Sequence, residues 1–214
     1  MKDLYSQKQT DYFESTRPEI QKFLPRKIKR LLDVGCGSGM VSWTAKQNLG
    51  IEYVAGIELF EDAANQAKTR LDKVITGDLE SVDLEFPDKY FDCVLCADSL
   101  EHMVDPWNAL TKLGRLLDDD GKLVVSLPNI QNIIPLFKIM FNRLEYEEHG
   151  ILDRSHLKFF TLHTMQKMFK DCGFEIEKQE SNISFNHPFA RKITFGLLDT
   201  FAVSIFYFIL KKKN

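Results

Sequence analysis

Asp33-Val-Gly35-Cys-Gly37-Ser-Gly39 is the stretch that decides the fold of this 214-residue chain. It follows an apolar segment, residues 29–34, that is typical of a buried strand, and it precedes a predicted helix over residues 40–47. Glycines between a strand and a helix let the backbone turn sharply and approach a ligand closely. The stretch therefore predicts the ligand-binding corner of a nucleotide-type sheet.

Strands and helices are expected to alternate after this loop. The next strands are predicted over residues 53–57, 73–76, 91–97 and 122–127, with helices over 62–71 and 106–117. Alternation at this spacing implies an α/β fold, in which a doubly wound and mostly parallel sheet has helices on both faces.

The C-terminal part departs from that alternation. We expect a helix over residues 130–144, a polar and aromatic loop over 149–160, a helix over 162–171, and closing strands over 174–178 and 201–210. Thr161 is the expected N-cap of the second of these helices, and Gly173 its C-terminal stop. The sheet would then have seven strands.

The length fits one domain, 1–214, of this kind. Its expected parts are an N-terminal helical cap (1–27), a cofactor-binding core (28–129), substrate-side helices and loop (130–173), and closing strands (174–214).

The charges near the glycine-rich loop distinguish between cofactor classes. A dinucleotide fingerprint, G-x-G-x-x-G, would require a third glycine at the position that Met40 occupies. Asp33 places a carboxylate beside the loop, which repels a pyrophosphate and favours a cationic ligand. The formal net charge of -3 gives no global attraction for a nucleic-acid backbone, so no nucleic-acid partner is expected.

Two further carboxylates follow later strands. Glu58 ends the second strand, close to the ~20-residue spacing at which an acidic side chain accepts hydrogen bonds from ribose hydroxyls. Asp78 follows the third strand, where it is expected to accept a hydrogen bond from an adenine amino group. A surface or capping role for Asp78 is the alternative.

Two motifs carry a family resemblance. Leu31-Leu-Asp-Val-Gly-Cys-Gly-Ser-Gly39 resembles motif I of class I S-adenosylmethionine (SAM)-dependent methyltransferases. Leu100-Glu-His-Met-Val-Asp-Pro106 resembles the L-E-H-x-x-D-P signature of their small-molecule branch, which includes ubiquinone-type and polysaccharide- or lipopolysaccharide-biosynthesis enzymes. The resemblance runs over residues 12–127 and implies SAM as the cofactor and S-adenosylhomocysteine as the product.

The resemblance also implies a set of cofactor-binding residues. Tyr12, Phe13 and Arg17 resemble an upstream helix that closes over the cofactor, in which an arginine meets the methionine carboxylate. An exposed helical position is the alternative for Arg17. The complete expected set is Arg17, Asp33, Gly35, Cys36, Gly37, Gly39, Glu58, Leu59, Asp78, Leu79, Ala97, Asp98 and Ser99.

The substrate side is expected to lie in the stretch from Gly150 to Thr161. Its sequence resembles a G-x-L-D-x-x-H-x-x-F-F-T segment of methyltransferases encoded among bacterial surface-polysaccharide genes. A hydroxyl acceptor benefits from a base near neutrality, and His156 and His102 are the candidates. Pairing with Asp153 is the alternative role for His156, and a structural hydrogen bond is the alternative for His102.

No metal ligands are expected. Cys93 and Cys96 have C-x-x-C spacing, but positions three apart on a strand point to opposite faces, so both are predicted to pack in the core. Unpaired cysteines and the absence of an apolar leader favour a reducing cytoplasm. The apolar run 201–210 is too short to span a bilayer and is expected to be a buried strand, with membrane-surface contact as the alternative.

These observations predict a methyltransferase that acts on a small molecule. The expected acceptor is a hydroxyl group of a sugar or of a lipid-linked glycan precursor. A quinone or phenol O-methyltransferase is the alternative within the enzyme class. A SAM-binding regulatory protein without catalysis is the alternative from another class. There is no N/D-P-P-Y/F motif of the kind used for amino methylation, and the sequence specifies no oligomeric state.

Overall fold

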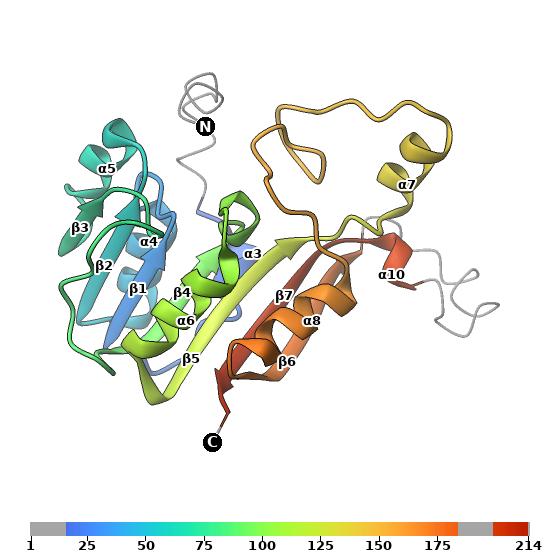
Figure 1. Cartoon of the computed structure of the whole chain (residues 1–214). Coiled ribbons are helices and arrows are strands. Elements are labelled where there is room, and N and C mark those ends of the chain that lie inside the picture. Colours follow the sequence, from blue (N-terminus) through green and yellow to red (C-terminus); the bar gives the residue numbers. More distant parts are fainter. Residues whose placement is uncertain (1–15, 184–198, 214) are drawn as a thin grey trace.

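A computed structural model describes residues 16–183 and 199–213 (Figure 1). Tyr12 and Phe13, which were expected to close over the cofactor, lie outside the described residues. One sheet of seven strands forms the centre, in the order β3-β2-β1-β4-β5-β7-β6. The strands are β1 (Arg30–Val34), β2 (Tyr53–Glu58), β3 (Lys73–Thr76), β4 (Phe91–Ala97), β5 (Leu117–Pro128), β6 (Phe174–Ile183) and β7 (Val203–Lys212).

The first five strands are parallel, and β7 is antiparallel to both of its neighbours. β1 lies between β2 and β4, so the chain leaves β1 toward one side of the sheet and later returns to its other side. Connections that diverge in this way open a crevice at the carboxyl ends of the strands, where ligands bind in doubly wound sheets. The expected α/β fold is confirmed.

Helices cover both faces of the sheet (Figure 1). Buried side chains of α3 (Pro18–Gln21), α4 (Met40–Leu49) and α5 (Glu61–Ala67) join one core cluster. The other cluster contains buried side chains of α6 (Pro106–Leu116) and α8 (Leu162–Asp171).

The two cysteines of the C-x-x-C pair separate between these cores. Cys93 packs in the cluster of α3 and α4, whereas Cys96 packs in the cluster of α6 and α8. Both are fully buried, and burial raises the pKa of both thiols. The pair therefore fills two apolar cores, as predicted from the strand alternation.

The apolar C-terminal run forms an interior strand of the sheet. A short helix, α10 (Asp199–Ala202), precedes β7, which lies between β5 and β6. Phe206, Tyr207 and Phe208 are each at most 3% exposed. Their hydrophobicity is thus accounted for by the core. Within the described residues, no helix combines the length and apolar character that crossing a membrane requires.

The expected helix over 130–144 is shorter in the structure, and this prediction was wrong at both ends. Helix α7 spans Ile133–Met140. It starts late because the Asn132 side chain accepts a hydrogen bond from the Ile134 N–H and so caps the first turn. It stops early because Asn142 adopts a left-handed conformation, with φ of 54°.

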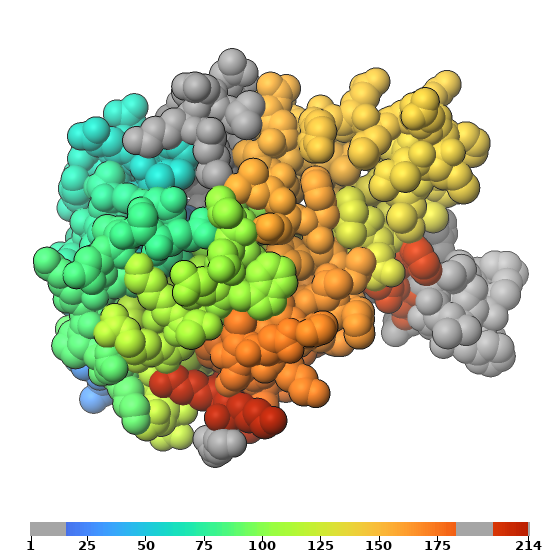
Figure 2. Space-filling view, viewed as in Figure 1, coloured from blue at the N-terminus to red at the C-terminus, as the bar shows by residue number. Residues whose placement is uncertain are grey.

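Other boundaries shift in the same local way. α5 ends at Ala67 rather than residue 71, β5 and β6 are longer than expected, and β7 runs two residues further toward the C-terminus. Residues 141–161 contain no helix or extended strand, which confirms a loop over 149–160. Figure 2 shows this yellow-to-orange segment across the end of the molecule where the carboxyl ends of the parallel strands lie.

Candidate functional site

Hydrogen bonds hold the glycine-rich loop against the end of β2. The N–H groups of Gly35 and Cys36 both donate to the Ile57 carbonyl, at 2.9 and 3.1 Å. The Gly37 N–H donates to Oε2 of Glu58 at 2.8 Å, and the Phe60 N–H donates to Oε1 at 2.9 Å. Glu58 thus fixes the loop, and since each carboxylate oxygen has a second lone pair, it retains acceptor capacity toward a ligand.

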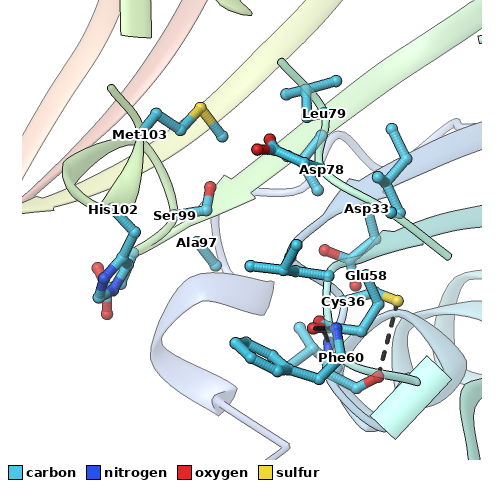
Figure 3. A pocket seen from close by; sticks show the side chains of 18 of the residues that line it. Asp33, Cys36, Glu58, Phe60, Asp78, Leu79, Ala97, Ser99, His102 and Met103 are labelled. Atoms are coloured by element: carbon cyan, nitrogen blue, oxygen red, sulfur yellow. Dashed lines mark hydrogen bonds between the residues drawn. The ribbon is translucent and has the colours of Figure 1, made fainter. Parts of the chain in front are cut away.

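A cavity of about 360 Å³ lies between this loop and the end of β4. Figure 3 shows Ala97, Ser99 and His102 on one side of it and Cys36, Glu58 and Phe60 on another. Twelve of the expected cofactor residues line it: Arg17, Asp33, Gly35, Cys36, Gly37, Glu58, Leu59, Asp78, Leu79, Ala97, Asp98 and Ser99.

Gly39 does not belong to this lining. It is the N-cap of α4, and a Cβ at this position would lie 3.3 Å from the Ala67 Cβ and 3.1 Å from Leu71 Cγ. The absence of a side chain at Gly39 therefore allows α4 to pack closely against the end of α5 and the segment that follows it.

The cavity carries a strong excess of acidic groups. Among the described lining residues, five are carboxylates (Asp33, Glu58, Asp78, Glu80 and Asp98), whereas the basic ones are Arg17 and His102. A low-dielectric, acidic wall favours a cationic ligand and disfavours a phosphate.

Asp33 is the most deeply placed of these acids. It is 2% exposed, and its Oδ2 has no hydrogen-bond partner among the described residues. Burial, with the nearby Glu58 charge adding to it, raises the pKa of Asp33 to about 7. A buried carboxylate without a full set of partners is a group that a cationic ligand can satisfy.

Asp78 occupies the rim of the cavity and has a local partner as well. Its Oδ1 accepts a hydrogen bond from the Glu80 N–H at 2.9 Å. The capping role left open by the sequence is therefore present, and it coexists with a place in the cavity wall.

Arg17 and Asp98 form an ion pair at one end of the cavity. The Arg17 guanidinium lies 2.8 Å from Asp98 Oδ2 and 2.6 Å from Glu19 Oε1. Asp98 also accepts a hydrogen bond from the Ser126 hydroxyl, which ties it to β5. Arg17 is thus the partly buried N-cap of α3 and lines the cavity, and its contact with a methionine carboxylate stays a prediction.

A second cavity, of about 470 Å³, adjoins the first. Arg17, Asp98 and His102 line both cavities. The loop over 149–160 contributes Ile151, Asp153 and His156 to the second one.

The two candidate histidines lie together. Their ring centroids are 4.8 Å apart, and His156 Nε2 is 3.9 Å from Glu101 Oε1. His156 Nδ1 is 3.0 Å from the Ile151 carbonyl, and Asp153 Oδ1 accepts from the N–H and hydroxyl of Ser155. Asp153 and His156 therefore each organise the loop through separate hydrogen bonds.

Glu101 belongs to the Leu100–Pro106 motif, but the sequence alone predicts no role for it. It is completely buried, and burial raises the pKa of its carboxyl well above the usual range. Phe60 and Met103 were also missed, although both line the first cavity. Both could have been predicted from their positions in the sequence, because each comes within two residues of a residue already expected in the site.

Comparisons with known proteins agree with this geometry. A family model described as a methyltransferase domain matches residues 8–179. The chain is 29% identical over 182 residues to a demethylmenaquinone methyltransferase of Listeria welshimeri, covering 74% of this chain and 75% of that protein. It is 31% identical over 102 residues to the 27-O-demethylrifamycin SV methyltransferase of Amycolatopsis mediterranei, covering 45% and 37% of the two chains.

Solved structures share the fold. The crystal structure of a SAM-dependent methyltransferase from Archaeoglobus fulgidus superposes with a TM-score of 0.70 at 18% identity, over 91% of each chain.

Proposed function

Because the chain belongs to the family of SAM-dependent methyltransferases, we propose that it methylates a hydroxyl group of a small, glycan-like acceptor bound in the second cavity. The observation that carries this proposal is the wall that Asp98 and His102 share between the two cavities. A donor in one cavity and an acceptor in the other would meet at this wall, and such alignment is a main source of rate in group transfer.

The residues of the first cavity fit SAM. Glu58 and Asp78 are suited to the ribose and the adenine amino group, and the partly unsatisfied Asp33 carboxylate is suited to a cation. SAM supplies a methyl group bonded to a sulfonium. The chain's contribution on this side is to hold that cation among carboxylates and to exclude water from it.

Polar side chains in the second cavity favour a hydroxyl-rich acceptor. Asn132, Lys138, Glu147 and Asp153 line it together with the two histidines. Side chains of this kind recognise hydroxyl groups by hydrogen bonds. Lys138 and Glu147 also form an ion pair, which connects α7 to the segment just before the loop over 149–160.

A quinone or phenol acceptor is the second candidate. The relatives named demethylmenaquinone methyltransferase favour it, as does a ubiquinone/menaquinone biosynthesis C-methyltransferase of Francisella philomiragia that is 26% identical over 177 residues. Ile134 and Pro135 give the second cavity an apolar side, and Phe137 and Met140 of the same helix are exposed. An acceptor with a lipid portion would use that surface.

The test is transfer of labelled methyl groups from SAM to matched panels of acceptors. We expect label on lipid-linked or nucleotide-linked sugars, and mass spectrometry should place it on oxygen. Label on a quinone ring carbon would instead establish the second candidate. SAM binding without transfer to any acceptor would favour a regulatory protein.

The affinity for SAM is expected to rise with pH. Because the pKa of Asp33 lies at about 7 in the folded protein, its carboxyl is largely protonated below that pH, and a cationic ligand binds the ionised form. The Kd should therefore fall as pH rises from about 5, by up to about tenfold per pH unit, and level off above about 8.

Calorimetric titrations of SAM across this pH range check the prediction. Asp33→Asn should bind SAM weakly at every pH and lose most of the slope. Asp62→Asn, on the exposed face of α5, is the control. A slope that persists in Asp33→Asn but disappears in Glu58→Gln would assign the titration to Glu58, whose pKa burial also raises.

His156→Ala is expected to lower methyl-transfer turnover by about tenfold or more while SAM affinity stays unchanged, because the imidazole acts on the acceptor side. His163→Ala, an exposed histidine of α8, should leave both quantities unaltered. Steady-state kinetics and SAM calorimetry separate the two effects. Turnover equal to that of the unmodified protein would remove His156 from the reaction.

A further inference from the structure

Glu101, His102 and His156 form a cluster with the composition of a metal site. The first two belong to the 3-10 turn η1 (Leu100–His102), and the third comes from the loop over 149–160. One potential ligand atom from each lies within 4.8 Å of the other two. We propose that these three side chains bind a divalent transition-metal cation, which holds the acceptor hydroxyl. Metal binding by this cluster does not depend on the proposed function, whereas the role of the metal in catalysis rests on it.

The histidine rings are oriented for this role. His102 Nδ1 lies 3.0 Å from the Ser155 carbonyl, and His156 Nδ1 lies 3.0 Å from the Ile151 carbonyl. A carbonyl only accepts, so Nδ1 is the donor in both rings, and when such a ring is neutral its lone pair is on Nε2. A backbone carbonyl that fixes the tautomer of a ligating histidine is a usual outer-shell feature of metal sites.

Glu101 supplies a buried carboxyl group whose two oxygens are free to accept a ligand bond. Its side chain is 0% exposed, and both carboxylate oxygens lack a hydrogen-bond partner among the described residues. Glu101 is also one of the residues that line the second cavity, where an acceptor would bind. Burial of such a group is costly unless it is paired or coordinates a metal.

The backbone holds the three residues in one place. The N–H groups of Leu157 and Lys158 donate to the Glu101 carbonyl at 2.9 and 3.0 Å, which joins the loop to η1 directly beside His156. The His102 N–H donates to the Ser99 carbonyl at 3.2 Å. The cluster is therefore built into the wall shared by the loop and the end of β4.

The spacing allows coordination after a small movement. Ligand atoms about 2.0–2.2 Å from a cation lie at most about 4.4 Å apart, and His156 Nε2 is already 3.9 Å from Glu101 Oε1. Two imidazoles and one carboxylate favour Mn²⁺, Fe²⁺ or Zn²⁺ over Ca²⁺. Three protein ligands leave positions open for oxygens of the acceptor, and adjacent hydroxyls of a sugar suit two such positions.

A bound cation would change how the hydroxyl is activated. A hydroxyl coordinated to a divalent cation loses its proton to water more readily, as water itself does. The oxygen then forms a bond to the methyl carbon, the sulfur–carbon bond breaks, and its electron pair remains on sulfur as S-adenosylhomocysteine. His156 and His102 would serve as ligands in this arrangement, with the proton leaving to solvent.

The test is metal binding by the chelator-treated full-length chain, measured by electron paramagnetic resonance with Mn²⁺ and by calorimetry with Zn²⁺. We expect one cation per chain. Glu101→Gln and His156→Ala should each weaken binding by about 100-fold or more, since even loss of an outer-shell partner costs about 10–100-fold. Glu147→Gln, a carboxylate of the same cavity outside the cluster, and His163→Ala are the matched controls.

SAM binding by each variant shows that the first cavity is intact, and His156→Ala carries the test if Glu101→Gln does not fold. Absence of Mn²⁺ and Zn²⁺ binding by the unmodified chain would overturn the proposal. Equal metal affinities in the cluster variants and in the controls would also overturn it. That result would indicate that Glu101 and His156 pair with each other and bind no metal. Metal binding without hydroxyl methylation leaves the site standing and refutes the proposed function. Hydroxyl methylation that is unaffected by chelator would support the proposed function and would refute the role of the metal in it.

Discussion

Gly35→Val is expected to weaken SAM binding by about 100-fold or more, which corresponds to about 2.7 kcal/mol. Gly35 has φ of +70°, and a Cβ there would lie 3.3 Å from the Ser99 Cβ. A β-branched residue in a left-handed conformation costs about 1–3 kcal/mol, and the backbone can relieve this only by moving the loop. Because the loop forms the cavity wall, both the movement and the added methyl groups reduce the space for the cofactor.

The control for this variant is a second glycine with nearly the same backbone conformation. Gly50 has φ of +67° and ends α4, and a Cβ there would meet nothing within 4 Å. Gly50→Val should therefore lower thermal stability through left-handed strain yet bind SAM with unchanged Kd. Calorimetry with SAM and with S-adenosylhomocysteine compares the two variants. If both bind equally well, the loop at Gly35 is not the cofactor cradle.

Most residues that line the first cavity could be predicted from the sequence, because their positions depend on the local backbone. Gly35, Gly37 and Glu58 each lie at a carboxyl end of a strand, and parallel strands bring these ends to one edge of the sheet. Strand alternation in the same way predicted that Cys93 and Cys96 face different cores. Both results require only periodicity and spacing along the chain.

The acceptor side could not be predicted to the same depth. The nearness of Glu101 to His156 depends on hydrogen bonds between the Glu101 carbonyl and the loop at Leu157, 56 residues further along the chain. The ion pair between Arg17 and Asp98 likewise forms only when the chain has folded. Such contacts between irregular segments follow from the packing of the whole domain and have no periodic signal.

Phe208→Ala is expected to lower the free energy of unfolding by about 3–5 kcal/mol. The ring is completely buried on β7, and its centroid lies 5.0 Å from that of Phe169 on α8 in an edge-on arrangement. Truncation leaves a cavity between strand and helix that packed neighbours fill only in part. Since domains of this kind are stable by only about 5–15 kcal/mol, chemical denaturation should show a large shift in midpoint.

Phe141→Ala is the matched control, because Phe141 is 63% exposed and stacks on Phe137, which is itself 48% exposed. Its effect should stay within about 1 kcal/mol. The comparison also decides the role of the apolar C-terminal run. If Phe208→Ala left stability unchanged and instead weakened binding to lipid vesicles, the run would be a membrane-contact surface rather than an interior strand. The burial of Phe206, Tyr207 and Phe208 predicts the opposite pattern, with loss of stability and no change in vesicle binding.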